Sequence, residues 1–186
     1  VPDLNNPLAV TSKDISGFKD IENRFTTATL ALNYKIPGVE GLKARLMHNR
    51  EYRTRKEAAF RKKFNLYNYN PESDNYDAYT TGDSRLVKSF SDRDFKTSQI
   101  SLNYETIIDD KHSLKLLALY EQSESEFDNF YAGRYFAIDI PQLYSGVNDS
   151  RQEANSDANG IYKTANQGFV GRVNYNFKSK YMAEFS

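Results

Sequence analysis

Apolar and polar side chains alternate along six stretches of the chain, near residues 24–34, 42–52, 95–106, 113–121, 169–177 and 181–186. A period of two places successive side chains on opposite faces of a β-strand. In the first stretch Leu30, Leu32 and Tyr34 share one face, while Thr29 and Asn33 share the other. The pattern therefore predicts six strands, each with one apolar face and one polar or small face.

The connections between these stretches are short and long in turn. Turn residues such as Pro37-Gly38 and Asp109-Asp110-Lys111 make the short ones, and the spans 53–94 and 122–168 make the long ones. An Asn-Tyr pair comes just before each of the three short turns. Short turns on one side and long loops on the other are typical of a transmembrane β-barrel. We therefore expect an all-β chain whose antiparallel strands form part of the wall of a large barrel, with long extracellular loops.

The composition is compatible with this interpretation. The mean hydropathy is −0.75, yet the chain has 14 Tyr and 12 Phe. A barrel strand needs only about 10 residues with every second one apolar, so a membrane barrel can look hydrophilic. The chain has no Cys, which excludes a disulfide framework and a thiolate metal site. A formal net charge of zero argues against a nucleic-acid partner.

The alternation assigns side chains to the membrane surface. We expect the following apolar side chains to face lipid: Leu30, Leu32, Leu42, Leu46, Ile100, Leu102, Leu114, Leu116 and Val173. Tyrosines beside the short turns would form an interfacial girdle, because a phenol ring is apolar in its body and polar at its tip. These are Tyr34, Tyr104, Tyr175 and Tyr181.

Two other classes of protein share part of this pattern. A soluble β-rich glycan-binding module also alternates apolar and polar positions, because its inner face is apolar and its outer face is wet. In such a module the tyrosines would be ordinary strand residues. A passive porin-like barrel would share all of the strand physics. The alternation of short and long connections favours a barrel over the soluble module.

A family resemblance sharpens the barrel interpretation. The segment 168–181, GFVGRVNYNFKSKY, resembles the GR-x-NY-x-[YF]-K-x-[KR]-Y signature of SusC/RagA-like TonB-dependent transporters. Asn6-Pro7-Leu8-Ala9, Asn23-Arg24-Phe25 and the hairpin from Tyr34 to Leu42 resemble preceding strands of that family, in the same order. The resemblance extends over essentially all of the chain, and 168–181 is its most specific part.

The resemblance implies an outer-membrane barrel of about 22 strands with a plugged lumen. Members import bulky nutrients, typically oligosaccharides and in some cases peptides, with energy relayed by TonB. They usually work with a SusD-like surface lipoprotein that closes over the pore. We therefore expect residues 1–186 to be a fragment of one barrel domain, with the plug, the TonB-contacting part and the barrel ends outside it. Outer-membrane lipid and lipopolysaccharide would be further partners.

Catalytic and ligand-binding patterns are sparse. The two histidines, His48 and His112, are expected near opposite rims, so we predict no enzyme. We expect no cofactor and no metal, since Asn155-x-Asp157-x-Asn159-Gly160 lacks the two strongest ligands of a calcium loop. Aromatic rings beside polar groups can stack on sugar faces. The candidate substrate residues in the second long loop are Tyr131, Arg134, Tyr135 and Tyr144, although these rings could instead pack the loop.

The segment from Arg50 to Lys63 is the most basic part of the chain. It would suit contact with lipopolysaccharide phosphates or with an acidic lid protein. A solvated loop whose charges keep it soluble explains the same residues equally simply.

Overall fold

The structure, a computed structural model, describes residues 7–186, and it is all-β, with 69% of the chain in strands and 8% in helices. Asn6, which takes part in the family resemblance, lies outside the described residues. The elements in chain order are α1 (Pro7–Thr11), α2 (Lys13–Ser16), β1 (Gly17–Lys35), β2 (Leu42–Arg61), β3 (Asn65–Asn70), β4 (Asn75–Thr80), β5 (Ser84–Ile108), β6 (His112–Phe136), η1 (Leu143–Ser145), β7 (Glu153–Asn155), η2 (Ala158–Gly160), β8 (Tyr162–Phe177) and β9 (Tyr181–Phe185).

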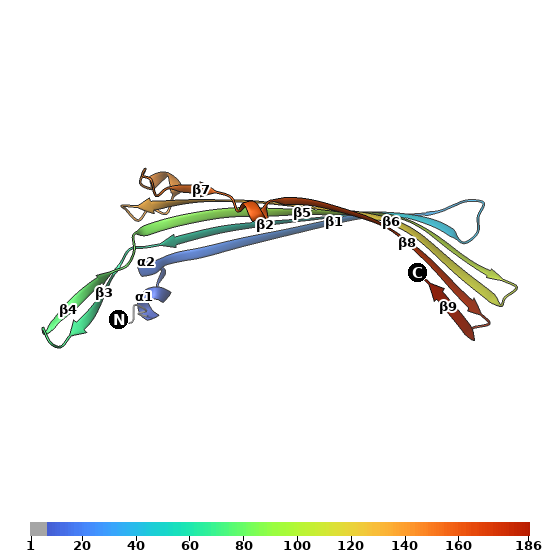
Figure 1. The fold of residues 1–186 in the computed structure, drawn as a ribbon, viewed down its shortest axis with the longest axis horizontal. Helices are drawn as coiled ribbons and strands as arrows, with labels where there is room; N and C mark the ends of the chain where they lie inside the picture. The colour runs from blue at the N-terminus through green and yellow to red at the C-terminus, as the bar shows by residue number, and fades with distance from the viewer. Residues whose placement is uncertain (1–6) are drawn as a thin grey trace. The chain divides into compact units, whose positions relative to one another are not determined.

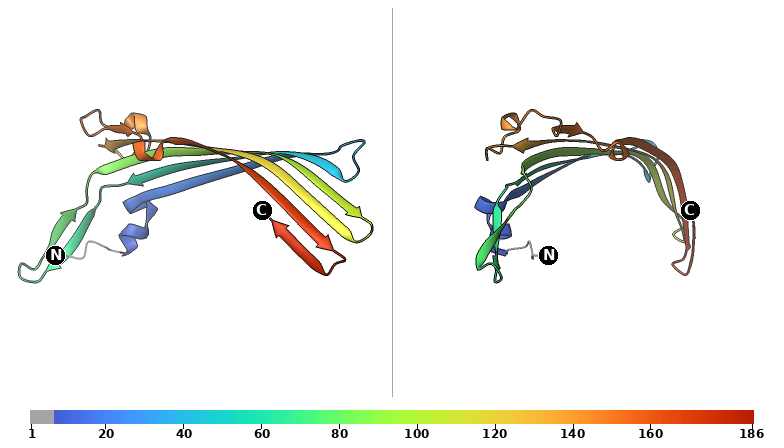
Figure 2. Two further views of the ribbon diagram at one scale, coloured as in Figure 1. Left: turned by 45° about the vertical axis from the view of Figure 1, so that its right-hand side comes forward. Right: turned by 60° about the vertical axis from the view of Figure 1, so that its left-hand side comes forward.

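Two antiparallel sheets contain these strands. The larger sheet has the order β1-β2-β5-β6-β8-β9, with β7 paired to β6, and it does not close on itself (Figure 1). The smaller sheet is the hairpin β3–β4, and Figure 2 gives two further views of the strands. β6 and β8 pair in continuous register from His112↔Phe177 to Phe127↔Tyr162.

The strands are longer than the hydrophobic pattern predicted. β2 continues to Arg61, β5 begins at Ser84 and β6 continues to Phe136. The spans 53–94 and 122–168 are therefore not long loops throughout, and 53–94 also holds β3 and β4. The pattern missed these parts because charged and polar side chains occupy both strand faces there, so the period of two disappears while the backbone pairing continues. Residues 7–23, which show no sustained alternation, form α1, α2 and the start of β1.

The short turns have the backbone geometry of tight hairpins. Asp109 and Asp110 have φ of 52° and 51°, and Lys178 and Ser179 have φ of 49° and 56°. Two successive residues with positive φ are typical of type I′ turns, whose twist matches that of the flanking strands. In the first hairpin Gly38 and Gly41 take up the positive φ. These turns hold each strand pair in register.

The chain divides into two compact units. The described residues of unit 1 are 7–24, 54–92 and 128–161, and its small core consists of Phe60, Leu86 and Phe136. The Phe60 ring meets Phe136 edge-on at a centroid distance of 5.7 Å. Phe18 and Leu143 pack against this cluster from β1 and η1. Unit 1 is therefore held by an aromatic core as well as by strand pairing.

Unit 2 has no such core. It consists of Phe25–Arg53, Arg93–Phe127 and Tyr162–Ser186, all of which the structure describes. Its only buried side chains are those of Ser101 and Ser125. Its large apolar side chains lie at the surface, with Leu30 71% and Phe169 83% exposed. Strand pairing and surface contacts, rather than a buried core, organise this unit.

Candidate functional site

One face of unit 2 gathers its apolar side chains. Residues directly opposite each other on paired strands point to the same face. The register places Leu114 opposite Tyr175 and Leu116 opposite Val173, and Val173 is in turn opposite Phe185. Leu42, Leu102, Leu116 and Val173 line a shallow hollow of about 330 Å³ on this face. By strand alternation Leu46 lies on the same side as Leu42, and Ile100 on the same side as Leu102.

The opposite face of unit 2 is more polar, and Leu117, Leu119 and Val170 also lie on it. Lys115 on β6 pairs with Glu105 on β5 at 2.6 Å, and Gln99 donates to Glu121. Arg93 Nε donates to the buried hydroxyl of Ser125 at 3.4 Å. The sheet of unit 2 thus separates an apolar surface from a hydrogen-bonded one.

A polar belt borders the apolar face at one end. The Arg50 guanidinium makes two hydrogen bonds of 2.9 Å to the Asp94 carboxylate, and Lys96 reaches the same carboxylate at 3.1 Å. Next to them His48 Nδ1 lies 2.9 Å from the Ser98 hydroxyl. The apolar surface therefore has a defined edge where charged side chains begin.

The predicted girdle tyrosines lie beside the short turns. Tyr34, Tyr175 and Tyr181 are exposed, and Tyr104 is half-buried in the hollow that Leu102 also lines. The Tyr175 hydroxyl lies 2.6 Å from His112 Nδ1, and the His112 ring is 4.9 Å from that of Phe177. Rings and hydroxyls thus occur together at this edge, although no contact with lipid follows from that alone.

The four candidate substrate residues do not converge on one site. Tyr131 is half-buried where β6 pairs with β7, and Tyr144 on η1 is 81% exposed. Arg134 donates to the Leu143 carbonyl oxygen at 2.9 Å and to Asn148, so it fastens the loop after β6. Its neighbour Tyr135 points to the other face of the strand, because successive strand residues alternate.

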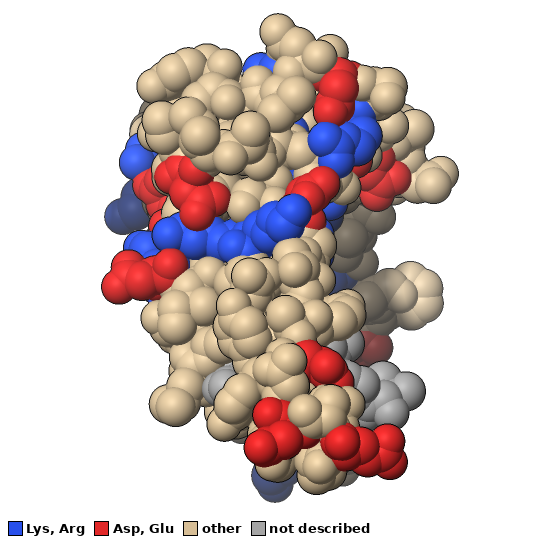
Figure 3. Space-filling view, turned by 90° about the vertical axis from the view of Figure 1, so that its left-hand side faces the viewer, with Lys and Arg blue, Asp and Glu red and all other residues tan. Residues whose placement is uncertain are grey.

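Tyr135 is the centre of a network of charges in unit 1. The guanidinium carbons of Arg85 and Arg151 lie 5.5 and 4.6 Å from the centre of its ring. Arg85 pairs with Glu153 at 2.5 Å, and Arg151 pairs with Asp83 at 2.9 Å. Because guanidinium groups already lie against this ring, a sugar could stack on it only by displacing them. Figure 3 shows such basic and acidic side chains side by side across one face.

The acidic members of these clusters are held in the charged form. Hydrogen bonds from Arg151 and Lys63 lower the pKa of Asp83, and those from the Arg151 side chain and backbone lower the pKa of Asp149. Hydrogen bonds from Lys19 and Arg55 likewise lower the pKa of Glu57. The paired carboxylates in turn raise the pKa of Arg151. None of these groups is poised to exchange a proton near neutral pH.

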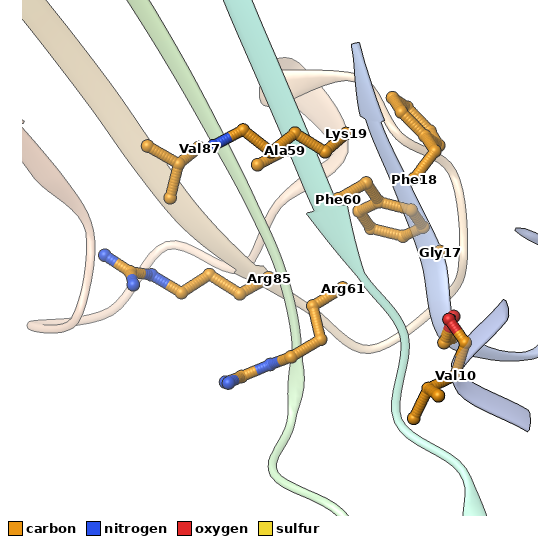
Figure 4. Close-up of a pocket in the computed structure, with 10 residues that line it drawn as sticks. Val10, Gly17, Phe18, Lys19, Ala59, Phe60, Arg61, Arg85 and Val87 are labelled. Atoms are coloured by element: carbon orange, nitrogen blue, oxygen red, sulfur yellow. The ribbon is translucent and has the colours of Figure 1, made fainter. Parts of the chain in front are cut away.

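A hollow of about 400 Å³ lies close to this network (Figure 4). The side chains of Arg61, Arg85 and Val87 extend to one side of the strands, while Phe18 and Phe60 extend to the other. Lys19, which also lines the hollow, pairs with Glu57 at 2.7 Å. Within residues 7–186, Arg61 has no acidic partner. The hollow therefore offers cationic groups rather than a catalytic pair.

Sequence reasoning missed two sets of residues. Arg85 and Arg151 lie in the spans 53–94 and 122–168, which were predicted to be long polar loops. No sequence pattern there indicates that they contact Tyr135. The exposed tyrosines of β3 and β4 were also missed, although their strands carry a detectable signal. Tyrosine alternates with asparagine over residues 67–70, before a turn at 71–74, and Tyr76 and Tyr79 follow that turn.

The described residues hold no group of three or more His, Asp or Glu side chains arranged to bind a metal ion. No helix between residues 7 and 186 is both long and apolar enough to cross a membrane.

Comparison with known proteins gives similarity at the level of structure only. No protein-family model and no curated protein matches the chain. It is similar to the structure of the RagAB peptide transporter, with a TM-score of 0.63 and 21% identity, over 87% of this chain and 17% of that chain. It is also similar to the RagAB peptide importer in its open-open state, with a TM-score of 0.65 and 19% identity over 86% of this chain and 16% of that chain. For the closed-closed state of the importer the TM-score is 0.62 and the identity 21%, over 86% of this chain and 16% of that chain.

The likeness is one of fold. At 19–21% identity it shows that this all-β sheet follows a part of those structures, and the chain spans only 16–17% of their length.

Proposed function

We propose that this chain forms part of the wall of an outer-membrane β-barrel that imports a bulky nutrient. The observation that carries the proposal is the uncovered apolar face of unit 2. No described residue of unit 2 buries a large apolar side chain, and the register places Leu114, Leu116, Val173 and Phe185 on one surface. A lipid bilayer is an environment in which such a surface gains stability from exposure.

This observation also separates the proposal from a soluble glycan-binding module. A soluble sandwich needs a second layer about 10 Å away to cover its apolar face. The strands of unit 2 all belong to one sheet, so unit 2 supplies no such layer of its own. Under the proposal, the nine apolar residues assigned to lipid contact the bilayer, and Tyr34, Tyr104, Tyr175 and Tyr181 lie at its interface.

The nature of the cargo and of the partners follows from two sources of support. The SusC/RagA-like signature at 168–181 favours energy supply through TonB and a SusD-like lipoprotein as lid. The similar solved structures are those of a peptide importer and favour peptides over oligosaccharides as cargo. Tyr131, Tyr135 and Tyr144 remain our candidates for substrate contact, whereas Arg134 acts by fastening its loop.

Uptake by cells tests the proposal. The complete protein would be expressed in its native host with and without a functional TonB system, and the uptake of labelled oligopeptides and oligosaccharides would be measured. TonB-dependent uptake is expected. Equal uptake in both strains would support the passive porin-like alternative instead. Recovery of the protein as a monomer in the soluble fraction, without detergent, would contradict the barrel proposal altogether.

A further inference from the structure

The hairpin β3–β4 stands as a sheet of its own. Its strands pair only with each other, from Asn65↔Thr80 to Asn70↔Asn75. A lone two-stranded hairpin in water is marginally stable unless something packs against it. Yet this hairpin carries four large rings that remain exposed: Tyr67 at 65%, Tyr69 at 49%, Tyr76 at 65% and Tyr79 at 46%. Exposed tyrosines grouped in this way are typical of binding surfaces.

The register sorts these rings onto two faces. Tyr67 is opposite Ala78 and Tyr69 is opposite Tyr76, so these four residues share one face. Tyr79 is opposite Leu66 on the other face. The Tyr69 and Tyr76 rings lie 5.5 Å apart and tilted. Ala78 is small and exposed, with aromatic residues beside and across from it. On this face the small Ala78 thus lies beside the larger rings of Tyr67 and Tyr76.

The charge of the hairpin has a single sign. Between residues 65 and 80 the chain contains Glu72, Asp74 and Asp77 and no Lys or Arg. Asp74 lies at the turn end of this face, where its carboxylate accepts a hydrogen bond of 2.8 Å from the Tyr69 hydroxyl. Acidic side chains gather at the lower edge of Figure 3, the end at which Figure 1 draws this hairpin.

We propose that the tyrosine face of β3–β4 binds a Lys or Arg side chain of a peptide. The alkyl stem of such a residue lies over Ala78 between the rings, because long cationic side chains cover apolar surface with their stems. The cation then meets the faces of Tyr67 or Tyr76 and the Asp74 carboxylate. Aromatic faces attract cations, and an adjacent carboxylate adds Coulomb attraction. Neutral sugars or acidic ligands would gain no Coulomb attraction from Asp74 at the turn end of this face.

A binding assay with the complete detergent-solubilised protein tests the inference. The probes are fluorescent peptides of equal length that carry Lys, Gln or Glu at the same positions, together with a neutral oligosaccharide as competitor. Fluorescence anisotropy gives the dissociation constants. The Lys peptide should bind tightest and the Glu peptide weakest. The preference should shrink when the ionic strength rises from about 0.01 M to about 1 M, because the Debye length falls from about 30 Å to about 3 Å.

Variants on the two faces of the same hairpin provide matched controls. Replacing Tyr67 and Tyr76 together by Ser should weaken Lys-peptide binding roughly tenfold, at about twofold to fivefold for each ring. Asp74→Asn should lower the preference for Lys over Gln. The controls Tyr79→Ser and Asp77→Asn alter the other face, so they should leave the dissociation constant within about twofold, since surface changes away from a site have small effects.

Three results would overturn the inference: equal binding of the Lys and Glu peptides, equal losses in the control variants, or release of the Lys peptide by the neutral oligosaccharide. The assay measures binding at the hairpin without transport. Its outcome is therefore separate from that of the proposed import function, which TonB-dependent uptake tests.

Discussion

The two units of this chain handle apolar side chains in opposite ways. Unit 1 buries Phe60, Leu86 and Phe136 in a small core, and it surrounds Tyr135 with arginines and carboxylates. Unit 2 buries only two serines, and large apolar side chains such as those of Leu30, Leu102 and Val173 stay exposed. The same antiparallel pairing underlies both units, so backbone hydrogen bonding does not explain the difference.

Under the proposed function, the two units differ in their environment, which is water for unit 1 and lipid for the apolar face of unit 2. In water an apolar side chain contributes stability only when other protein atoms cover it, at about 25 cal/mol per Å². Unit 1 follows that rule in its small core. Under the proposed function, unit 2 would follow the rule of a barrel wall, in which the apolar band faces lipid and the polar groups face inward.

The largest effect is expected from Phe60→Ala in the core of unit 1. Phe60 is 3% exposed and its ring contacts those of Phe18 and Phe136. Removing a buried Phe ring costs about 3–5 kcal/mol. Hydrogen–deuterium exchange should rise in 54–61 and 128–136 and stay unchanged in unit 2. Ile138→Ala, at a side chain that is 59% exposed, is the control. Faster exchange throughout unit 2 would show that the units do not respond separately.

The next effect concerns the apolar face of unit 2. Leu102→Arg places a cation on that face, and an Arg near the middle of a bilayer costs about 2–4 kcal/mol. Asn103→Arg puts the same side chain on the polar face, so it should be tolerated. Folding into lipid vesicles, followed by heat-modified gel mobility, compares the two variants. Equal losses, or a greater loss for Asn103→Arg, would contradict the assignment of the faces.

The sequence predicted unit 2 better than unit 1 for a physical reason. In unit 2 the apolar face must continue over several residues on each strand, which leaves the period-two signal of Leu30, Leu32 and Tyr34. The assignment of Leu114, Leu116 and Val173 to one face agrees with the strand register. Contact of these residues with lipid stays a prediction.

Unit 1 carries a weaker signal. Its strands continue through residues such as Arg55, Lys56 and Glu57, whose charges occupy both strand faces and hide the alternation. Its core needs only a few rings from distant parts of the chain, and no local pattern links Phe18 with Phe136. The Tyr135 network likewise depends on Arg85 and Arg151, which come close only because β5, β6 and the loop after β6 fold together. Such contacts are long-range, so no single segment encodes them.

A smaller effect is expected at the first turn of unit 2. Gly41 has φ of 82°, and a Cβ there would lie 1.9 Å from the Glu105 carbonyl oxygen. Gly38 has φ of 83°, but a Cβ there would meet nothing within 4 Å. Gly38→Ala should cost about 1–2 kcal/mol from backbone strain alone. In Gly41→Ala the new Cβ must in addition displace β5. This displacement breaks the hydrogen bond from Glu105 N to Gly41 O, which costs about another 1 kcal/mol.

Denaturant unfolding of both variants measures this difference. Gly41→Ala should be the less stable of the two, and exchange should rise at the β2–β5 pairing only in that variant. If the two variants were equally stable, the close approach of Gly41 to β5 would not exist in solution.

The smallest effect should come from acid, acting on the ion pairs that hold residues 149–153 in unit 1. Hydrogen bonds from Arg151 and Lys63 lower the pKa of Asp83, so the folded state favours the ionised carboxylate. This contribution is fully present above the ordinary carboxyl pKa of about 4 and is lost as the pH falls through the lowered value. Because these groups are exposed, solvent and salt weaken the effect. Hydrogen–deuterium exchange at residues 149–153 should therefore rise as the pH falls from about 5, over a range of about 3 units.

Arg151→Gln should raise hydrogen–deuterium exchange at residues 149–153 already at neutral pH. A further fall in pH should then raise it less than in the wild type. If the wild type and Arg151→Gln responded to acid identically, the ion pairs around Tyr135 would not be what holds this loop on unit 1.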